Sequence, residues 1–324
     1  MTKLSVVISA FNEEKKIGAC LESVKGLADE IIIVDNSSYD ETAKIAKKYT
    51  TKVFTQKNDP KKIDIQKNFG FSKATGDWIL SLDADERVTP ELAREIKDVI
   101  LEGGKGRPRG SHHDSKDSIA SLQNDRGMSG YWIPRKNIIF GKWIRHTGWY
   151  PDNQLRLFKK GKGKYTSEHV HEHLFVEGIV GNLHEMLVHE HYATVGEFIS
   201  KMMVYAPSEA KNKLDNGYEF SYLDAISFPS REFISRFFAR EGYKDGLHGL
   251  VLSLLMAFYH EIIFVFLWEE KKYIDVNSDD FLHDVKKESV HIGRELAYWF
   301  TTESLKAARG LEKITLKIKR KLSL

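Results

Sequence analysis

The chain has 324 residues, 41% hydrophobic and 29% charged, which is ordinary for a folded soluble protein and long enough for one large domain with an appendage or for two domains. Its net charge of +3 is too small to indicate nucleic acid as a partner, and its single cysteine, Cys20, excludes a disulfide framework and a thiolate metal cluster. We expect a cytosolic protein without a signal peptide, because one cysteine fits a reducing compartment and the N-terminus has no basic region followed by an apolar one.

The first hundred residues alternate between strand-like and helix-like patterns. Apolar, β-branched runs predict strands at 4–9, 30–34, 52–54 and 78–82. Helical spacing between them predicts helices at 13–24, 40–49 and 63–74. Buried strands that alternate with helices predict an α/β domain with a parallel sheet covered on both faces. Ligands bind beyond the C-terminal strand ends of such sheets, where Asp35 and Asp83 stand.

Two carboxylates, Asp83 and Asp85, follow the buried strand at 78–82. Side chains at i and i+2 of an extended segment point the same way, so we expect these two to lie together. Like charges repel unless a cation lies between them, or between them and a phosphate. The pair therefore indicates a divalent metal that holds a diphosphate. The alternative is a solvated acidic turn that caps a helix starting near Pro90.

The rest of the chain contains three segments with different composition and patterning. Residues 103–130 are polar, Gly-rich and aperiodic, which predicts a flexible loop or insertion. Strand patterns return at 131–134 and 155–158, before a histidine-dense segment at 168–173. From about 195 the chain has helical patterns to its end. We therefore predict an α/β domain at 1–195 and a helical region at 196–324 that is a candidate for membrane association.

Four segments in this order, 5–14, 33–42, 66–78 and 83–86, resemble the family 2 glycosyltransferases. The resemblance covers about the first hundred residues and implies a GT-A fold, the fold of nucleotide-diphospho-sugar transferases. Later segments resemble a narrower subgroup, the lipopolysaccharide-core-type β-glycosyltransferases, at 152–158, 170–172, 178 and 189–192. The insertion at 103–130 departs from a compact version of this pattern, which leaves open what borders the acceptor cleft.

The resemblance implies a metal-dependent, inverting enzyme. Such an enzyme would move a hexose from a nucleotide-diphosphate sugar, with UDP-glucose expected, to a glycan or lipid-linked glycan of the cell envelope. Asp83 and Asp85 match the Asp-x-Asp motif of the family, so Asp85 would contact Mg²⁺ or Mn²⁺ directly. Asp83 would contact metal-bound water, ribose or both. Asp35 matches the position whose carboxylate accepts the N3–H of the base, usually uracil.

The same resemblance assigns further residues to the donor. Ala10, Asn12 and Glu14 belong to the loop after the first strand, which should wrap the nucleoside. For Glu14 the alternative is a charge at a helix N-terminus, which the helix dipole favours. Lys67 stands where the family often has a basic residue near the nucleotide, and a solvated lysine is the alternative.

A general base must face the anomeric carbon opposite the leaving group, and Glu172 is our candidate. Glu168 and Asp152 are its rivals. His171 could be a third metal ligand, because imidazole and carboxylates together suit Mn²⁺. A zinc site formed by three alternating histidines is the alternative, at His169, His171 and His173.

Arg156 lies between apolar residues of a predicted strand, so it needs an anionic partner. It could bind the donor diphosphate or an acceptor phosphate. A buried salt bridge with a nearby acid is the alternative.

The most apolar stretch, 250–268, carries Glu261 near its middle, which makes a membrane-spanning helix costly. A buried core helix or a helix in the membrane interface fits better. Because its flanks and the tail at 313–321 are basic, we expect association with an anionic membrane surface on the cytoplasmic side. The alternative is a helical subdomain with a solvated tail.

Two other enzyme functions share this fold or its sheet. A polyprenyl-phosphate sugar transferase would ordinarily have a clearer membrane segment. A nucleotidyltransferase would call for a Gly-rich, basic loop after the first strand, and the loop at 9–14 contains no glycine.

Overall fold

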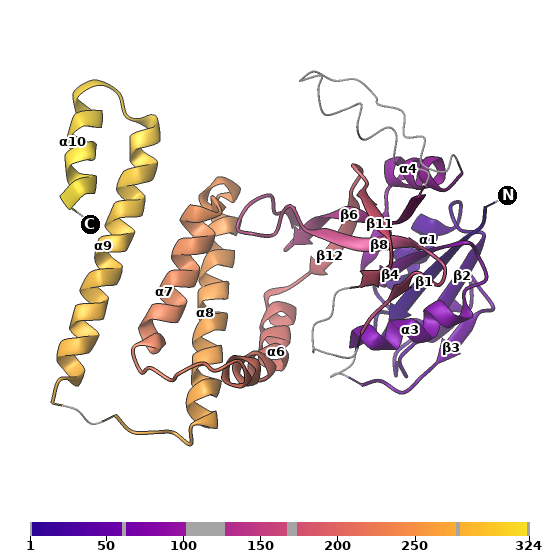
Figure 1. The fold of residues 1–324 in the computed structure, drawn as a ribbon, viewed down its shortest axis with the longest axis horizontal. Coiled ribbons are helices and arrows are strands. Elements are labelled where there is room, and N and C mark those ends of the chain that lie inside the picture. Colours follow the sequence, from indigo (N-terminus) through magenta and orange to yellow (C-terminus); the bar gives the residue numbers. More distant parts are fainter. Residues whose placement is uncertain (1, 60–62, 102–126, 167–173, 277–278, 323–324) are drawn as a thin grey trace. The chain divides into compact units, whose positions relative to one another are not determined.

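The computed structural model describes residues 2–59, 63–101, 127–166, 174–276 and 279–322 (Figure 1). It divides into two compact units. The first comprises Met1–Ile138 with Pro151–His191, and the second comprises Ile139–Tyr150 with Tyr192–Leu324. The sequence places a boundary at 195, and the second unit resumes at Tyr192. The short segment Ile139–Tyr150 also belongs to the second unit, although no sequence pattern singles it out.

The N-terminal half of the first unit is a parallel sheet, as predicted. Its strands are β1 (Leu4–Ala10), β2 (Glu30–Asp35), β3 (Val53–Thr55) and β4 (Trp78–Asp83). They lie in the order β3-β2-β1-β4, and all of their pairings are parallel. The connecting helices are α1 (Ile17–Val24), α2 (Thr42–Ala46) and α3 (Ile63–Lys73). The near-continuous apolar strands are explained by helices packed on both faces of this sheet.

Strands from later in the chain extend the same sheet beyond β4. The continuing order is β8 (Asn153–Lys159), β6 (Met128–Ile139), β12 (Leu187–Tyr192) and β5 (Glu86–Val88), and β11 (Ile179–Asn182) also pairs with β6. β8 is antiparallel to both β4 and β6, which makes the whole sheet mixed. A separate two-stranded sheet joins β9 (Gly163–Lys164) and β10 (Phe175–Val176). The predicted strands at 131–134 and 155–158 are therefore parts of longer ones.

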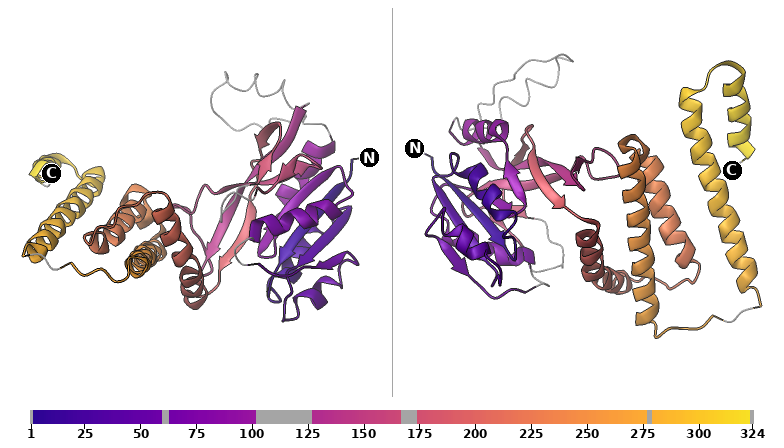
Figure 2. Two further views of the ribbon diagram at one scale, coloured as in Figure 1. Left: turned by 60° about the horizontal axis from the view of Figure 1, so that its bottom comes forward. Right: turned by 180° about the vertical axis from the view of Figure 1, so that it is seen from behind.

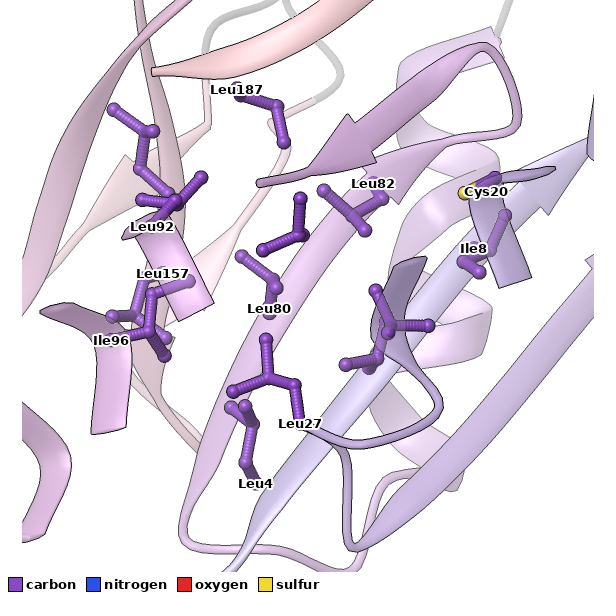
Figure 3. Close-up of a cluster of buried hydrophobic side chains, with 14 of the residues drawn as sticks. Leu4, Ile8, Cys20, Leu27, Leu80, Leu82, Leu92, Ile96, Leu157 and Leu187 are labelled. Atoms are coloured by element: carbon purple, nitrogen blue, oxygen red, sulfur yellow. The ribbon is translucent and has the colours of Figure 1, made fainter. Parts of the chain in front are cut away.

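Alternating side chains of each strand supply two separate cores. Val6 and Ile8 of β1 pack on one face with α1 and with α4 (Pro90–Leu101). Figure 3 shows Cys20 of α1 and Leu92 and Ile96 of α4 among the side chains of this cluster. Val7 points to the other face, where Phe71 of α3 and Phe158 of β8 cover it. This two-residue alternation is what a strand buried on both faces requires.

Helix α1 begins at Ile17, four residues later than the predicted start at 13. The preceding turn is bound to the loop after β2. The backbone N–H of Glu13 donates to Thr42 Oγ1 at 2.7 Å, and that of Glu14 donates to Asp40 Oδ2 at 3.1 Å. Because these side chains satisfy the N–H groups outside the helix, the segment forms a loop instead of a first helical turn.

The second unit is helical, as predicted from 195 onward. Its helices are α6 (Val195–Asp215), α7 (Asp224–Ile234), α8 (Leu247–Glu270), α9 (Phe281–Ala307) and α10 (Gly310–Leu322). Phe198 of α6 and Leu252 and Ile263 of α8 form its core, together with Ile144 from the Ile139–Tyr150 segment. α8 packs against α6 and α7, and α10 folds back along the end of α9 (Figures 1 and 2).

Helix α8 is the one helix of the described residues that is long and apolar enough to cross a membrane, with a mean hydropathy of 2.2. One side of α8 is buried in the second core, through Leu252 and Ile263. The other side exposes Leu254 and Phe258. Glu261 lies part-way along this helix, and burial raises the pKa of its carboxyl. α8 is thus a core helix on one side and an uncovered apolar surface on the other.

Candidate active site

The sheet register brings the predicted donor residues to one edge. Ala10 at the end of β1 pairs with Asp35 at the end of β2, and Ser9 pairs with Asp83 at the end of β4. Three parallel strands therefore end side by side, at the edge where ligands of open α/β sheets bind. Asp35 is buried, and its Oδ1 accepts a hydrogen bond from the backbone N–H of Ser38 at 3.3 Å.

Asn12 and Glu14 shape the loop at this edge. Asn12 has a left-handed backbone with φ +55°, which asparagine tolerates better than most residues. Its Oδ1 accepts from the backbone N–H of Tyr39 at 3.0 Å. The Glu14 carboxylate accepts from the N–H of Glu41 at 3.1 Å, so it lies at the start of α2 and not at that of α1. The loops after β1 and β2 are therefore joined into one surface.

Asp83 is paired with two cations. Its Oδ1 lies 2.7 Å from Lys67 Nζ, and its Oδ2 lies 2.6 Å from Arg156 Nη2. Burial opposes ionisation of Asp83, but Arg156 and Lys67 outweigh it and hold the pKa of this carboxyl well below its ordinary value. Lys67 itself is buried, with its ammonium 5.4 Å from the centre of the Tyr165 ring. The alternative of a solvated lysine therefore does not describe Lys67.

Asp85 has a different environment, although it is only two residues away. β4 ends at Asp83, and Ala84 and Asp85 form a turn before β5, so the expected alternation of an extended segment does not apply. The Oδ2 of Asp85 lies 3.5 Å from His189 Nε2. Burial opposes ionisation of Asp85, but the hydrogen bond from His189 lowers the pKa of the carboxyl. Asp83 at the end of β4 and Asp85 in the turn thus take partners from different elements, α3 and β8 for Asp83 and β12 for Asp85.

A third carboxylate, Glu86, is fully buried beneath this turn. Its Oε1 accepts from Arg156 at 2.8 Å and from Arg135 at 3.3 Å, and its Oε2 accepts from the backbone N–H of Asp83 at 3.0 Å. Arg156 thus forms the buried salt bridges that the sequence left as the alternative to phosphate binding. Burial opposes the charge of Arg156, but Asp83 and Glu86 raise its pKa. Its Nε is buried without a hydrogen-bond partner among the described residues.

Asp152, one of the rival bases, lies on the far side of Arg135. The Arg135 Nη2 is 2.7 Å from Asp152 Oδ2, and Asn137 donates to the same oxygen at 2.9 Å. Burial opposes ionisation of Asp152, but Arg135 lowers its pKa. A carboxylate with a lowered pKa is a weak proton acceptor, so this environment suits a structural role for Asp152 better than a catalytic one.

Polar contacts continue from Asp152 back to Asp85. Asn137 Oδ1 lies 2.7 Å from His189 Nδ1, and His189 Nε2 lies 3.1 Å from His191 Nδ1. Through His189, this network returns to Asp85. Asp85 and Asp152 are therefore joined by a largely buried network of hydrogen bonds and ion pairs.

Several predicted residues lie outside the described residues. They are the base candidates Glu172 and Glu168, the metal candidate His171, and the alternative zinc ligands His169 and His173; most of the predicted insertion also falls there. Within the described ranges, no group of three or more His, Cys, Asp or Glu side chains is arranged to hold a metal ion by itself.

Sequence reasoning gave no role to Glu86, Arg135 or His189. A signal for Glu86 was present, because Arg156 in an apolar strand requires a buried acid and Glu86 follows the Asp-x-Asp motif directly. No short-range pattern identifies Arg135, which is linked to the site through strand pairing across the sheet. His189 belongs to the segment at 189–192 that resembles the subgroup, but the resemblance assigned it no partner.

The chain is similar in sequence to known glycosyltransferases. The family model described as "Glycosyl transferase family 2" matches residues 5–166. The lipopolysaccharide core biosynthesis glycosyltransferase LpsC of Rhizobium meliloti is 29% identical over 266 residues, which cover 79% of this chain and 88% of that protein. An uncharacterized glycosyltransferase of Rickettsia typhi is 27% identical, covering 80% of this chain and 84% of that protein.

Among solved structures, residues 1–349 of S. aureus TarS in complex with UDP-GlcNAc are 14% identical. The match covers 86% of this chain and 94% of that chain, with a TM-score of 0.37. The glucosyl-3-phosphoglycerate synthase of Mycobacterium tuberculosis with Mn²⁺ and UDP-glucose is 22% identical, covers 32% of this chain and 41% of that chain, and has a TM-score of 0.26. These low scores establish no more than a distant likeness.

Proposed function

This chain belongs to glycosyltransferase family 2 and has the GT-A fold, and from that membership we propose that it transfers a hexose from UDP-glucose, with inversion, to a glycan or lipid-linked glycan of the cell envelope. The observation that carries the donor half is the meeting of Asp35 and the Asp83–Asp85 turn at adjoining strand ends. The name of the Rhizobium relative, a lipopolysaccharide core enzyme, supports the acceptor class.

The nucleoside would bind at the ends of β1 and β2. The Asp35 carboxylate is a hydrogen-bond acceptor and suits the N3–H of uracil. Ala10 stands beside it in the sheet register, and Asn12 and Glu14 hold the joined loops in place. The role proposed for these two side chains is thus to shape the nucleoside site.

Asp83 and Asp85 would hold Mg²⁺ or Mn²⁺. Carboxylate oxygens are the ligands that hard divalent cations prefer. The absence of a three-residue metal group in the described part of the chain is compatible with this assignment, because a donor diphosphate supplies further oxygen ligands. Bound there, the cation would neutralise charge on the leaving diphosphate. His171 remains our proposed third ligand, and Arg156, which pairs with Asp83, remains our proposed contact of the diphosphate.

Glu172 remains our proposed base. The acceptor hydroxyl would lose its proton to this carboxylate while its oxygen bonds to the anomeric carbon and the bond to the diphosphate breaks. Asp152 is the weaker rival, because Arg135 lowers its pKa.

The donor assignment is tested with Asp85→Asn in the full chain. We expect UDP-glucose to raise the melting temperature of the wild type with Mn²⁺ and much less with EDTA, because ligand that binds only the folded state stabilises it. Asp85→Asn should lose this difference and lower donor turnover about 100-fold or more. The matched control is Asp98→Asn, which changes an exposed aspartate on α4.

Retained Mn²⁺ dependence in Asp85→Asn would contradict the metal assignment. Equal or greater stabilisation by UDP-GlcNAc or a GDP-sugar would contradict UDP-glucose as the donor. The anomeric configuration of the product, read by NMR, decides between inversion and retention.

We also propose that the enzyme works at the cytoplasmic face of the membrane, bound to anionic lipid. α10 exposes Leu311, Ile314 and Ile318, which the helical repeat places on one side. Five basic side chains flank this stripe, at Lys313, Lys317, Lys319, Arg320 and Lys321. An apolar stripe flanked by cations is the pattern of a helix that lies in the membrane interface.

A further inference from the structure

The Ile139–Tyr150 segment of the second unit is held in one conformation by a buried acid. Asp245 lies at the end of a 3₁₀ turn, Gly242–Asp245, and is almost fully buried. Its carboxylate accepts from the backbone N–H groups of Arg145 at 3.3 Å and His146 at 2.8 Å. Arg236 donates to the Thr147 carbonyl at 2.8 Å. A buried carboxylate that accepts consecutive N–H groups fixes the backbone between its partners.

This anchoring determines which side chains the segment presents. Ile144 is fully buried in the second core, while its neighbour Arg145 is exposed. The Arg145 guanidinium carbon lies 4.2 Å from the centre of the Trp143 ring. The Trp143 and Tyr150 rings meet edge to face, with centres 5.8 Å apart at 90°. Trp143, Arg145 and Tyr150, hereafter the aromatic–arginine cluster, therefore form one contiguous group.

No acidic side chain of the described residues forms a salt bridge with Arg145, although its neighbour His146 contacts Asp245 at 3.2 Å. Stacking on Trp143 orients the planar guanidinium and reduces the rotamer entropy that binding would otherwise cost. The guanidinium is thus oriented to bind an anion, and the exposed Tyr150 adds aromatic surface beside it.

We propose that the aromatic–arginine cluster binds a negatively charged sugar of the acceptor glycan. A guanidinium pairs in a bidentate manner with a carboxylate or a phosphate, and an aromatic face packs against the C–H face of a pyranose ring. A sugar that carries an acidic group satisfies both at once, whereas an isolated anion would leave the aromatic surface unused. This inference rests on the proposed glycan acceptor and names its class as anionic.

The test measures binding of three probes to the full chain by calorimetry, without donor or metal. Trigalacturonic acid carries rings and carboxylates, maltotriose carries rings only, and inorganic phosphate carries charge only. We expect trigalacturonic acid to bind about tenfold or more tightly than either of the others. Arg145→Gln should reduce its affinity to that of maltotriose. Arg145→Lys keeps the charge without the planar fork and should recover only part of the affinity.

The matched control is Arg294→Gln, which removes an exposed arginine from α9 in the same unit and should bind trigalacturonic acid as the wild type does. Melting temperatures of all variants verify that they are folded. Equal affinity for the charged and neutral trisaccharides, or unchanged binding in Arg145→Gln, would overturn the proposal. A third outcome would also overturn it: Arg145→Gln loses binding to anionic vesicles but binds trigalacturonic acid as before. The cluster would then bind lipid and not a sugar. Because these measurements contain no donor, a negative result would not contradict the proposed transfer from a nucleotide sugar.

Discussion

Neighbouring carboxylates at the candidate active site have different partners and therefore different roles. Asp83 is paired with Lys67 and Arg156, whereas Asp85 faces His189. Glu86, one residue further, is fully buried and joins two arginines. The motif therefore combines a charge-compensated acid, a candidate metal ligand and a structural acid within four residues.

Glu86→Gln tests the structural role of that third acid. We expect it to lower the free energy of unfolding by about 3–5 kcal/mol, because Arg156 and Arg135 would lose the charge of a shared buried partner. Equilibrium urea denaturation measures the change. The control is Glu190→Gln, which breaks a partly exposed pair with Arg87 and should cost less than about 1 kcal/mol. Similar losses in both variants would show that the buried network is not a major source of stability.

At the scale of elements, one acid joins several strands at the edge of the sheet opposite the candidate active site. Glu30 begins β2, accepts from Ser5 of β1 and from Lys52 before β3, and accepts from the backbone N–H of Thr75 before β4. Burial opposes its charge, but the hydrogen bonds from Lys52, Ser5 and Thr75 lower its pKa from 4.5 to about 2.

This lowered pKa predicts an acid dependence of stability. The stabilisation that Glu30 provides is complete above its ordinary pKa of 4.5, declines as the pH falls towards about 2, and is absent below that value. Glu30→Gln should therefore be less stable than the wild type at about pH 6, and the difference should shrink at about pH 3. Urea denaturation at both pH values measures this. Glu22→Gln, which removes an exposed acid near Lys25, should show a small difference that does not change with pH.

Helix α3 packs closely on the sheet at Gly70, so a larger residue there should destabilise the first unit. A Cβ added at Gly70 would lie 2.5 Å from Val7 Cγ1 and 2.8 Å from Val34 Cγ2. Both contacts are on short, β-branched side chains that cannot swing away, so Gly70→Ala should destabilise the first unit by about 1–3 kcal/mol despite the better helix propensity of alanine. Gly18→Ala in α1 is the control, since its Cβ would make an ordinary 3.7 Å contact with Ile45. Thermal unfolding compares the two, and equal stability would contradict the close contact.

At the scale of the whole molecule, the chain combines a GT-A glycosyltransferase domain with a helical unit that exposes apolar surface. Leu254 and Phe258 of α8 and Ile314 and Ile318 of α10 are all exposed. An enzyme that acts on a lipid-linked glycan must meet its acceptor at a membrane, so a lipid-binding surface on the second unit would serve the proposed reaction.

Charge reversal on α10 tests this membrane proposal. Wild-type protein should float with phosphatidylglycerol vesicles at low salt and bind zwitterionic vesicles weakly. Lys317→Glu combined with Lys321→Glu should reduce binding to anionic vesicles about tenfold or more, because each cation near such a surface contributes about 1 kcal/mol. Lys286→Glu with Lys287→Glu on α9 is the control, since both side chains are exposed outside the amphipathic helix. Equal losses in the two pairs would show a general charge effect.

Short-range patterns were sufficient to predict the alternating elements, the family and the strand ends that carry Asp35 and Asp83. Each depends on residues close together in the sequence, because two-residue alternation and helical spacing reflect which face of an element is buried. The late start of α1 was missed, since Asp40 and Thr42 after β2 determine it. At Asp83 and Asp85 the turn named as the alternative is present, and the expected extended pair is not.

The sequence by itself thus determined a GT-A glycosyltransferase domain followed by a helical region, and where the donor diphosphate is expected to bind. Only the tertiary structure decided that Arg156 joins Asp83 to Glu86, that Arg135 lowers the pKa of Asp152, and that Ile139–Tyr150 packs with the second unit. The physical reason is that charge pairing in a buried network depends on strand register and burial. These bring together residues about fifty to seventy positions apart, and no local pattern specifies such contacts.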